Sequence, residues 1–202
     1  GCMPSKLLVA AAGSAHAVGK APEMGIHVDG GVRIDGRAVM DRIRCERDRF
    51  VGFALGEVQQ IPDADRLLGH ARFVDNRTLA VANHTRVQAK SIVIATGSRA
   101  DYPDSFKALG ERLIVSDNVF DWTDLPKSVA VIGPGIVGLE LGQALHRLGV
   151  RVAVLGRGGH LGPLSDPEIL ACAIATFKSE FVLEPDANIA SMERDGGRVV
   201  IR

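Results

Sequence analysis

Apolar residues recur at helical spacing along two stretches in the first third of the chain. Residues 6–18 are rich in Ala and Leu, which predicts a helix. Residues 25–34 are interrupted by two glycines and predict a loop or a short hairpin. A second, long amphipathic helix is expected to open at Asp35 or Gly36 and to run toward Pro62. The rest of its surface carries charges of both signs, Arg44 and Arg47 among them, and is expected to face solvent.

The pattern then changes from helical spacing to short β-like runs. Residues 68–74, 78–82, 85–88 and 91–95 are rich in β-branched residues and are separated by Asn- and Asp-containing turns. This arrangement predicts a small antiparallel meander that leads into one buried strand at residues 91–95.

A second α/β unit follows a connection at residues 101–125. Residues 128–132 and 151–155 are apolar strands, and a helix at residues 139–148 stands between them. Residues 169–177 continue as a helix that Ser165 or Asp166 is expected to cap, with Pro and Glu in its first turn. Three further strands are expected, at residues 181–183, 187–193 and 198–201.

A glycine-rich turn joins the first strand of this unit to its helix. In the sequence GPGIVG, Gly133 permits a tight turn, Gly135 lets the backbone reach a pyrophosphate, and Gly138 lets the helix pack closely on the strand. The free amides that follow, at Ile136 and Val137, can meet the phosphate. The order strand, turn, helix, strand predicts an α/β, Rossmann-like fold that binds a dinucleotide.

The position that selects the nucleotide lacks the usual acid. An Asp or Glu at the end of the second strand binds the adenosine ribose of NAD, but this chain has Gly156 there, followed by Arg157. An Arg can bind a 2′-phosphate with charge assistance, which favours NADP. The alternative is that Arg157 is a solvated loop residue.

Composition and charge exclude several classes of partner. The 202 residues are 46% hydrophobic, and 24 basic residues balance 24 acidic ones. No net charge recruits nucleic acid or an anionic membrane, so a small-molecule partner is expected. Three cysteines far apart form no disulfide scaffold, and the cytoplasm is the expected location. Cys45 is expected to be an incidental thiol and Cys172 a small buried hydrophobe.

The opening residues GCMPSKLL carry a cysteine just ahead of a proline-started helix, a position typical of thiols with redox or nucleophilic chemistry. Together with the later motifs, this run resembles the redox-active disulfide motif of the class I pyridine nucleotide–disulfide oxidoreductases, and it looks most like the dihydrolipoyl dehydrogenase group. The resemblance implies that Cys2 is the second cysteine of the redox pair, the one nearest the flavin. The first cysteine would precede residue 1.

The resemblance also assigns roles to charged and cofactor-contacting residues. It implies that Lys6 and Glu140, which follow the two motifs, form an ion pair beside the flavin at the point of hydride transfer. The alternatives are a surface lysine for Lys6 and a helix pair with Arg147 for Glu140. Further residues that the resemblance implies as cofactor-binding are Ala71 and the ATGS residues Thr96, Gly97 and Ser98.

The resemblance implies FAD and NAD(P) as cofactors, no metal, and electron transfer between NAD(P) and a dithiol or disulfide, with dihydrolipoamide or a lipoyl domain as first choice. Residues 1–125 would belong to an FAD-binding domain and residues 126–202 to an NAD(P)-binding domain. The family also has an upstream βαβ unit and a downstream dimerisation domain, which this sequence lacks. The resemblance therefore implies that the chain is an inner piece of a homodimeric enzyme and that this piece is inactive alone. Other family activities remain open, namely an NADPH-dependent disulfide reductase, a transhydrogenase and a mercuric reductase, as does a non-catalytic nucleotide-binding fragment.

Overall fold

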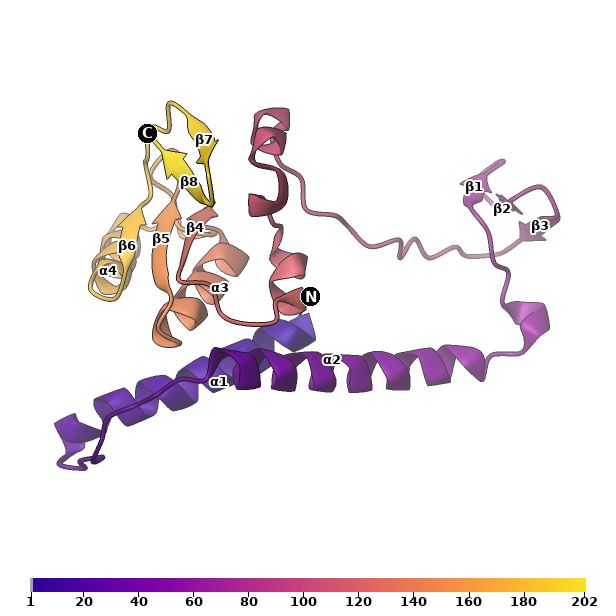
Figure 1. Cartoon of the computed structure of the whole chain (residues 1–202). Coiled ribbons are helices and arrows are strands. Elements are labelled where there is room, and N and C mark those ends of the chain that lie inside the picture. Colours follow the sequence, from indigo (N-terminus) through magenta and orange to yellow (C-terminus); the bar gives the residue numbers. More distant parts are fainter. Residues whose placement is uncertain (1) are drawn as a thin grey trace. The chain divides into compact units, whose positions relative to one another are not determined.

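The computed structural model describes residues 2–202 and divides the chain into two compact units (Figure 1). The first unit comprises the chain up to Arg47 together with Ala100–Arg202. The second unit comprises Asp48–Arg99. The FAD and NAD(P) domain boundary expected from the sequence, at residues 125 and 126, stays a prediction.

Two long helices occupy the first part of the chain. Helix α1 spans Cys2–Lys20 and is followed by the short 3₁₀ helix η1, Ala21–Met24. Helix α2 spans Gly36–Gln59. Both helices were predicted, although the predicted start of α1 is four residues late. The structure has no strand between η1 and α2, so this segment is a loop and not a hairpin.

Asp35 decides where α2 begins. Its carboxylate accepts a hydrogen bond from the backbone amide of Ala38 at 3.1 Å, which satisfies one of the free amides of the first turn. Of the two openings that the sequence left possible, Asp35 is therefore the capping residue and Gly36 the first helical residue.

The second unit contains the predicted meander. After the 3₁₀ helix η2, three short strands pair in antiparallel order β1-β2-β3. Ala80 and Val81 of the central strand are buried. The bounds are Asp63–Asp65 for η2, Ala71–Phe73 for β1, Thr78–Val81 for β2 and Thr85–Gln88 for β3.

The buried strand predicted at residues 91–95 is absent. This segment is non-regular, and the side chains of Val93 and Ile94 are 86% and 71% exposed. An apolar run becomes a strand only where a neighbouring strand supplies hydrogen-bond partners. Residues 2–202 provide no such neighbour for this run.

The first unit is built on a parallel sheet. Strands β4, β5 and β6 are neighbours in that order, and α3 and α4 connect them as the sequence predicted. Strands β7 and β8 form a separate antiparallel hairpin. The predicted strand at residues 198–201 is confirmed as β8, but the strand predicted at residues 187–193 is wrong for residues 187–191, which are non-regular. The bounds are Ser128–Ile132 for β4, Ile136–Arg147 for α3, Arg151–Leu155 for β5, Pro167–Lys178 for α4, Val182–Glu184 for β6, Met192–Asp195 for β7 and Arg198–Ile201 for β8.

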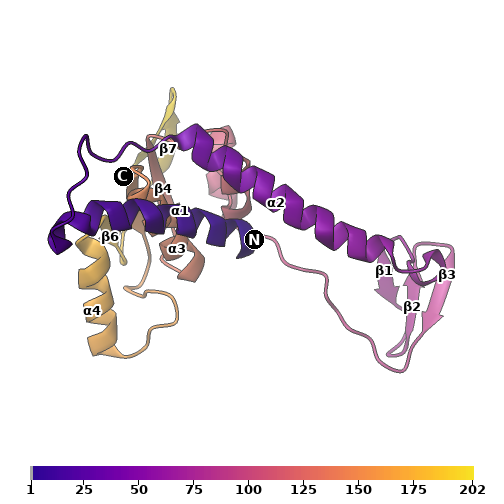
Figure 2. The ribbon, with the colours of Figure 1, turned by 90° about the horizontal axis from the view of Figure 1, so that it is seen from below.

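Helix α3 packs against strands β4 and β5 and also against helix α1, beside which it lies in Figure 2. One apolar cluster joins buried residues of α1 such as Leu8, residues of α3 such as Leu145, and sheet residues such as Val154, each fully or almost fully buried. Met40 and Ile43 from the beginning of α2 complete the cluster. The burial of this cluster fixes α1 against α3.

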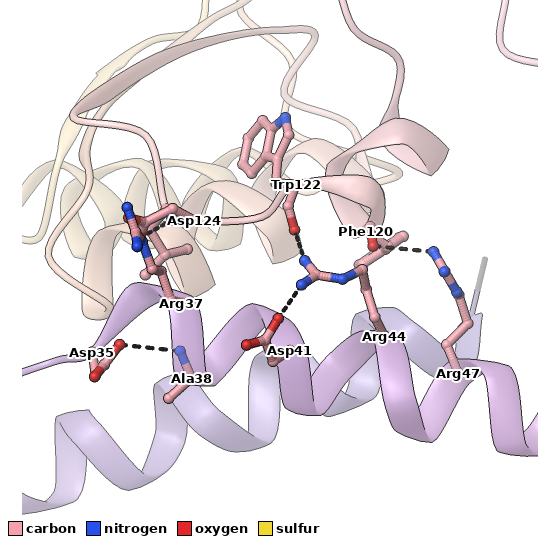
Figure 3. Close-up of polar contacts among 10 residues, drawn as sticks. Asp35, Arg37, Ala38, Asp41, Arg44, Arg47, Phe120, Trp122 and Asp124 are labelled. Atoms are coloured by element: carbon pink, nitrogen blue, oxygen red, sulfur yellow. Dashed lines mark hydrogen bonds and ion pairs between the residues drawn. The ribbon is translucent and has the colours of Figure 1, made fainter.

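The beginning of α2 also holds a connecting segment through arginines (Figure 3). Arg44 donates to the carbonyl of Trp122 and pairs with Asp41, and Arg47 donates to the carbonyl of Phe120 at 3.1 Å. The expectation that this charged face is solvated is therefore wrong for Arg44 and Arg47, whose side chains are only 23% and 26% exposed. The carbonyls lie in and after η4, Ser116–Asp121, which follows the longer 3₁₀ segment η3, Asp104–Arg112.

The three cysteines are free thiols on the surface. Cys45 agrees with the expected incidental position, but the prediction of a buried Cys172 is wrong. Cys172 lies on an exposed side of α4, whose residues include no buried one. Among residues 2–202, none of the helices combines the length and the apolar character needed to cross a bilayer.

Candidate functional site

The cysteine motif occupies the first turns of α1. Cys2 is the first residue of the helix and is exposed, while Pro4 is buried and anchors the turn. Lys6 follows Cys2 by four residues, so both side chains leave the same face of the helix. A thiol and a cation therefore share one end of α1.

An ion pair links this helix to the nucleotide motif. The Nζ atom of Lys6 lies 3.0 Å from the Oε1 atom of Glu140, which is 134 positions away in the sequence. The side chain of Glu140 is 25% exposed and that of Lys6 is 67% exposed. The contact agrees with the ion pair that the family resemblance implied.

The alternative partner of Glu140 is occupied elsewhere. Arg147 makes two hydrogen bonds to Glu180, at 3.0 and 2.9 Å, and Gln143 makes a third at 2.8 Å. These bonds tie the end of α3 to Glu180, two residues before β6. The helix pair between Glu140 and Arg147 that the sequence left open is therefore not formed.

The glycine turn between β4 and α3 has the tight geometry that its sequence requires. Gly133 has a φ of +104°, and its amide donates to the carbonyl of Leu155 at 2.8 Å. A Cβ atom on Gly138 would lie 2.2 Å from the carbonyl oxygen of Gly133. Only glycine fits at residue 138, because this clash is with backbone that cannot move aside.

The outer side of the same turn is open. Cβ atoms placed on Gly133 and Gly135 would meet nothing within 4 Å. Gly135 is the N-cap residue of α3, so no side chain caps this helix. The amides of the first helical turn, beginning at Ile136 and Val137, have no acceptor within the helix. Ile136 and Val137 are 64% and 53% exposed. The turn is accessible, and its geometry fits a dinucleotide pyrophosphate.

The position after β5 cannot hold an acidic side chain in this structure. Gly156 is buried, and a Cβ atom there would lie 2.5 Å from Cγ of Pro134 and 2.6 Å from the carbonyl oxygen of Pro185. The ring of Pro134 therefore fills the space that the ribose-binding acid of NAD enzymes would need. Arg157 follows and is exposed.

The remaining predicted cofactor residues lie in the second unit. Ala71 is the first residue of β1 and is exposed. Thr96, Gly97 and Ser98 form an exposed, non-regular segment in which Gly97 has a φ of +72°. The structure places Cys2, Lys6, Glu140 and the glycine turn in the first unit.

Two acidic side chains that link separate elements were missed by sequence reasoning. Asp186, which follows β6, accepts a hydrogen bond from the amide of Gly158 at 2.7 Å. Glu180 joins Arg147 and Gln143, as described above. No local pattern marks these acids, because each has its partner on another element. Within the described part of the chain, no cluster of His, Cys, Asp and Glu is arranged to hold a metal ion.

The family model of the pyridine nucleotide–disulphide oxidoreductases matches residues 1–199. This chain belongs to that family. A relative, the dihydrolipoyl dehydrogenase of Chlamydia trachomatis serovar D, is 30% identical over 210 aligned positions, which cover 98% of this chain and 43% of the relative. The soluble pyridine nucleotide transhydrogenase of Mycobacterium bovis is 33% identical over 111 positions, covering 52% of this chain and 24% of the relative.

Solved structures of the family share the fold. The flavoprotein disulfide reductase RclA of Escherichia coli superposes with a TM-score of 0.75 at 19% identity, over 100% of this chain and 43% of that one. The Rossmann-like α/β class predicted from the sequence is confirmed. The family uses FAD and NAD(P) as cofactors. The chain spans less than half the length of these relatives.

Proposed function

We propose that the protein takes part in electron transfer between a dithiol or disulfide and NAD(P), with FAD as the carrier between them. The observation that carries the proposal is the ion pair between Lys6 and Glu140. It joins the helix that opens with the cysteine motif to the helix that opens with the nucleotide turn. Two motifs with complementary redox roles thus meet within one packed unit.

Each residue has a defined task in this proposal. Cys2 would stand beside the flavin as one sulfur of the redox pair, and the partner cysteine would exchange with the dithiol or disulfide substrate. Bound FAD supplies the two-electron chemistry that connects thiols to nicotinamide. Lys6 stabilises negative charge that develops near the transferred hydride, and Glu140 keeps the ammonium group oriented. In the oxidising direction a dithiol loses two electrons and two protons, NAD(P)⁺ gains a hydride, and one proton is released.

The two cofactors would be held by different parts of the chain. Residues 1–125 would contribute to the FAD-binding domain, with Ala71 and the segment from Thr96 to Ser98 as contacts. Residues 126–202 would bind the nicotinamide nucleotide. The pyrophosphate would lie at the glycine turn, whose open outer side supports this assignment.

The proposed nucleotide is NADP(H). Pro134 and Pro185 leave no room for an acid at Gly156, and Arg157 offers a cation to a 2′-phosphate. A comparison of NADH and NADPH turnover tests this preference, and a tenfold preference for NADH would contradict it.

Dihydrolipoamide, free or on a lipoyl domain, is the first-choice substrate, because the dihydrolipoyl dehydrogenase alignment covers nearly the whole chain. An NADPH-driven disulfide reductase is the second candidate, since Gly156 and Arg157 favour the phosphorylated nucleotide. A homodimer without nucleic acid or membrane partners is proposed for the intact protein.

Replacing Glu140 by Gln tests the central role. The Gln side chain keeps the size of Glu140 but removes the charge that orients Lys6. Hydrogen bonds to charged groups contribute about 1.5–3 kcal/mol, so flavin reduction by the nicotinamide should slow by about tenfold or more. Stopped-flow absorbance of the flavin measures the rate in the intact, FAD-loaded enzyme.

Glu57→Gln serves as the matched control, because Glu57 is an exposed residue of α2 in the other unit. Its rate of flavin reduction should equal that of the wild type. An unchanged rate in Glu140→Gln would remove the support for a role of the ion pair in hydride transfer.

A further inference from the structure

The loop after β5 carries Arg157 and is fastened to its surroundings at several points. The amide of Gly159 donates to the carbonyl of Pro185 at 3.1 Å, and the amide of Gly162 donates to the carbonyl of Pro134 at 2.8 Å. These backbone bonds connect the loop both to the segment after β6 and to the glycine turn.

A side chain provides one further anchor, directly beside the arginine. The Oδ1 atom of Asp186 accepts a hydrogen bond from the amide of Gly158 at 2.7 Å. The backbone continues the same connection, since the amide of Ala187 donates to the carbonyl of Gly156 at 2.9 Å. Arg157 is therefore held on both sides by the segment that follows β6.

The anchored residues are those with the greatest backbone freedom. Gly158 and Gly159 have φ values of +78° and +74°. Two adjacent glycines lose more conformational entropy on ordering than other residues do. A charge-assisted hydrogen bond to the first of them limits this freedom at the residue that follows Arg157.

We propose that Asp186 is a positioning residue for nucleotide recognition, which holds the Gly158 amide and thereby fixes Arg157 for contact with the 2′-phosphate of NADP(H). The inference rests on the proposed function, because it assigns a device to the same nucleotide site. It adds Asp186, which follows β6, to a preference for NADP(H) that is otherwise attributed to the residues after β5.

The hydrogen bond and the charge of Asp186 have opposite effects on this ligand. The bond orders the loop and favours binding, whereas the negative charge disfavours a nearby phosphate. Asn keeps an oxygen that can accept the amide but has no charge, and Ala removes both. The two substitutions therefore separate positioning from electrostatics.

The experiment measures dissociation constants of NADPH and NADH by titration calorimetry for the wild type, Asp186→Ala and Asp186→Asn. Asp186→Ala is expected to weaken NADPH binding about tenfold, the effect of losing one such bond. Its NADH binding should change less than about threefold, because NADH has no 2′-phosphate for Arg157. Asp186→Asn should bind NADPH at least as tightly as the wild type.

Asp195→Ala is the control for removal of a surface acid, since Asp195 ends β7 and is exposed. Thermal unfolding of every variant verifies that it is folded. The inference is overturned if Asp186→Asn is as weak as Asp186→Ala, if Asp186→Ala binds NADPH normally, or if it weakens both nucleotides equally.

Arg157→Ala separates this inference from the proposed nucleotide preference. If Arg157→Ala leaves the ratio of the NADPH and NADH constants unchanged, the proposed preference fails and the inference fails with it. If Arg157→Ala lowers the NADPH preference but the Asp186 variants behave like the wild type, only the inference fails.

Discussion

Gly156 shows how much a single residue depends on neighbours that are distant in the sequence. The sequence reveals that the usual acid is missing after β5. It does not reveal that the ring of Pro134 and the carbonyl of Pro185 occupy the space, at 2.5 and 2.6 Å from a Cβ atom. The absence of an acidic side chain at this position is thus built into the packing of three segments.

Gly156→Ala is expected to lower the free energy of unfolding by about 1–3 kcal/mol, the usual cost of overpacking a filled interior. Chemical denaturation measures the change. Gly52→Ala is the control, because Gly52 lies in α2 with nothing within 4 Å of its Cβ position. It should leave the stability unchanged or raise it by up to about 1 kcal/mol. Equal stability of Gly156→Ala and wild type would contradict the close contacts.

At the scale of elements, local signals predicted where helices α2 and α4 begin. The Asp-Pro-Glu sequence predicted the start of α4, and the structure shows Asp166 accepting hydrogen bonds from the amides of Glu168 and Ile169 at 2.9 and 3.0 Å. Only these bonds distinguish Asp166 from Ser165 as the cap. A strand, by contrast, needs a partner, which is why the apolar run at residues 91–95 did not become one.

Asp166→Ala should reduce the free energy of unfolding by about 1 kcal/mol, because two amides of the first turn lose their acceptor. Urea denaturation followed by circular dichroism detects this change. Ser165→Ala should have no comparable effect, since the side chain that caps α4 is that of Asp166 and not that of Ser165. If the two variants lost the same stability, the assignment of the cap would be wrong.

At the scale of the whole unit, two charged contacts hold α3 at opposite ends. Glu140 near its beginning pairs with Lys6 of α1, and Arg147 at its end pairs with Glu180 before β6. Hydrogen bonding from Arg147 holds the pKa of Glu180 below its ordinary value of 4.5, against the opposing effect of burial. Gln143 and the charges of Arg147 and His16 act in the same direction.

This lowered pKa predicts a loss of stability in acid. A carboxyl group with a depressed pKa in the folded state stabilises the fold above its unfolded value, and the contribution disappears as the pH falls through the folded value. Glu180→Gln should therefore be less stable than the wild type at pH 7, by about 1–2 kcal/mol. The difference should shrink as the pH is lowered below 4.5.

Urea denaturation at a series of pH values tests this expectation. Glu193→Gln is the control, because the pair of Glu193 with Arg202 is about 60% exposed on both sides and such surface pairs contribute little. A stability difference for Glu180→Gln that stays constant between pH 7 and pH 3 would contradict the assigned role of Arg147.

The sequence by itself determined those features that depend on residues close together along the chain. The glycine turn, the alternation of strands and helices around it, and the start of α4 follow from local geometry and hydrogen bonding. The Lys6–Glu140 pair was expected only through the family resemblance, and the structure brings the two side chains together. Tertiary structure alone turned Arg44 and Arg47 of a charged helix face toward backbone carbonyls and set Asp186 against Gly158. A charged side chain can reach several partners, and only the packing of the apolar core brings one of them within hydrogen-bonding distance.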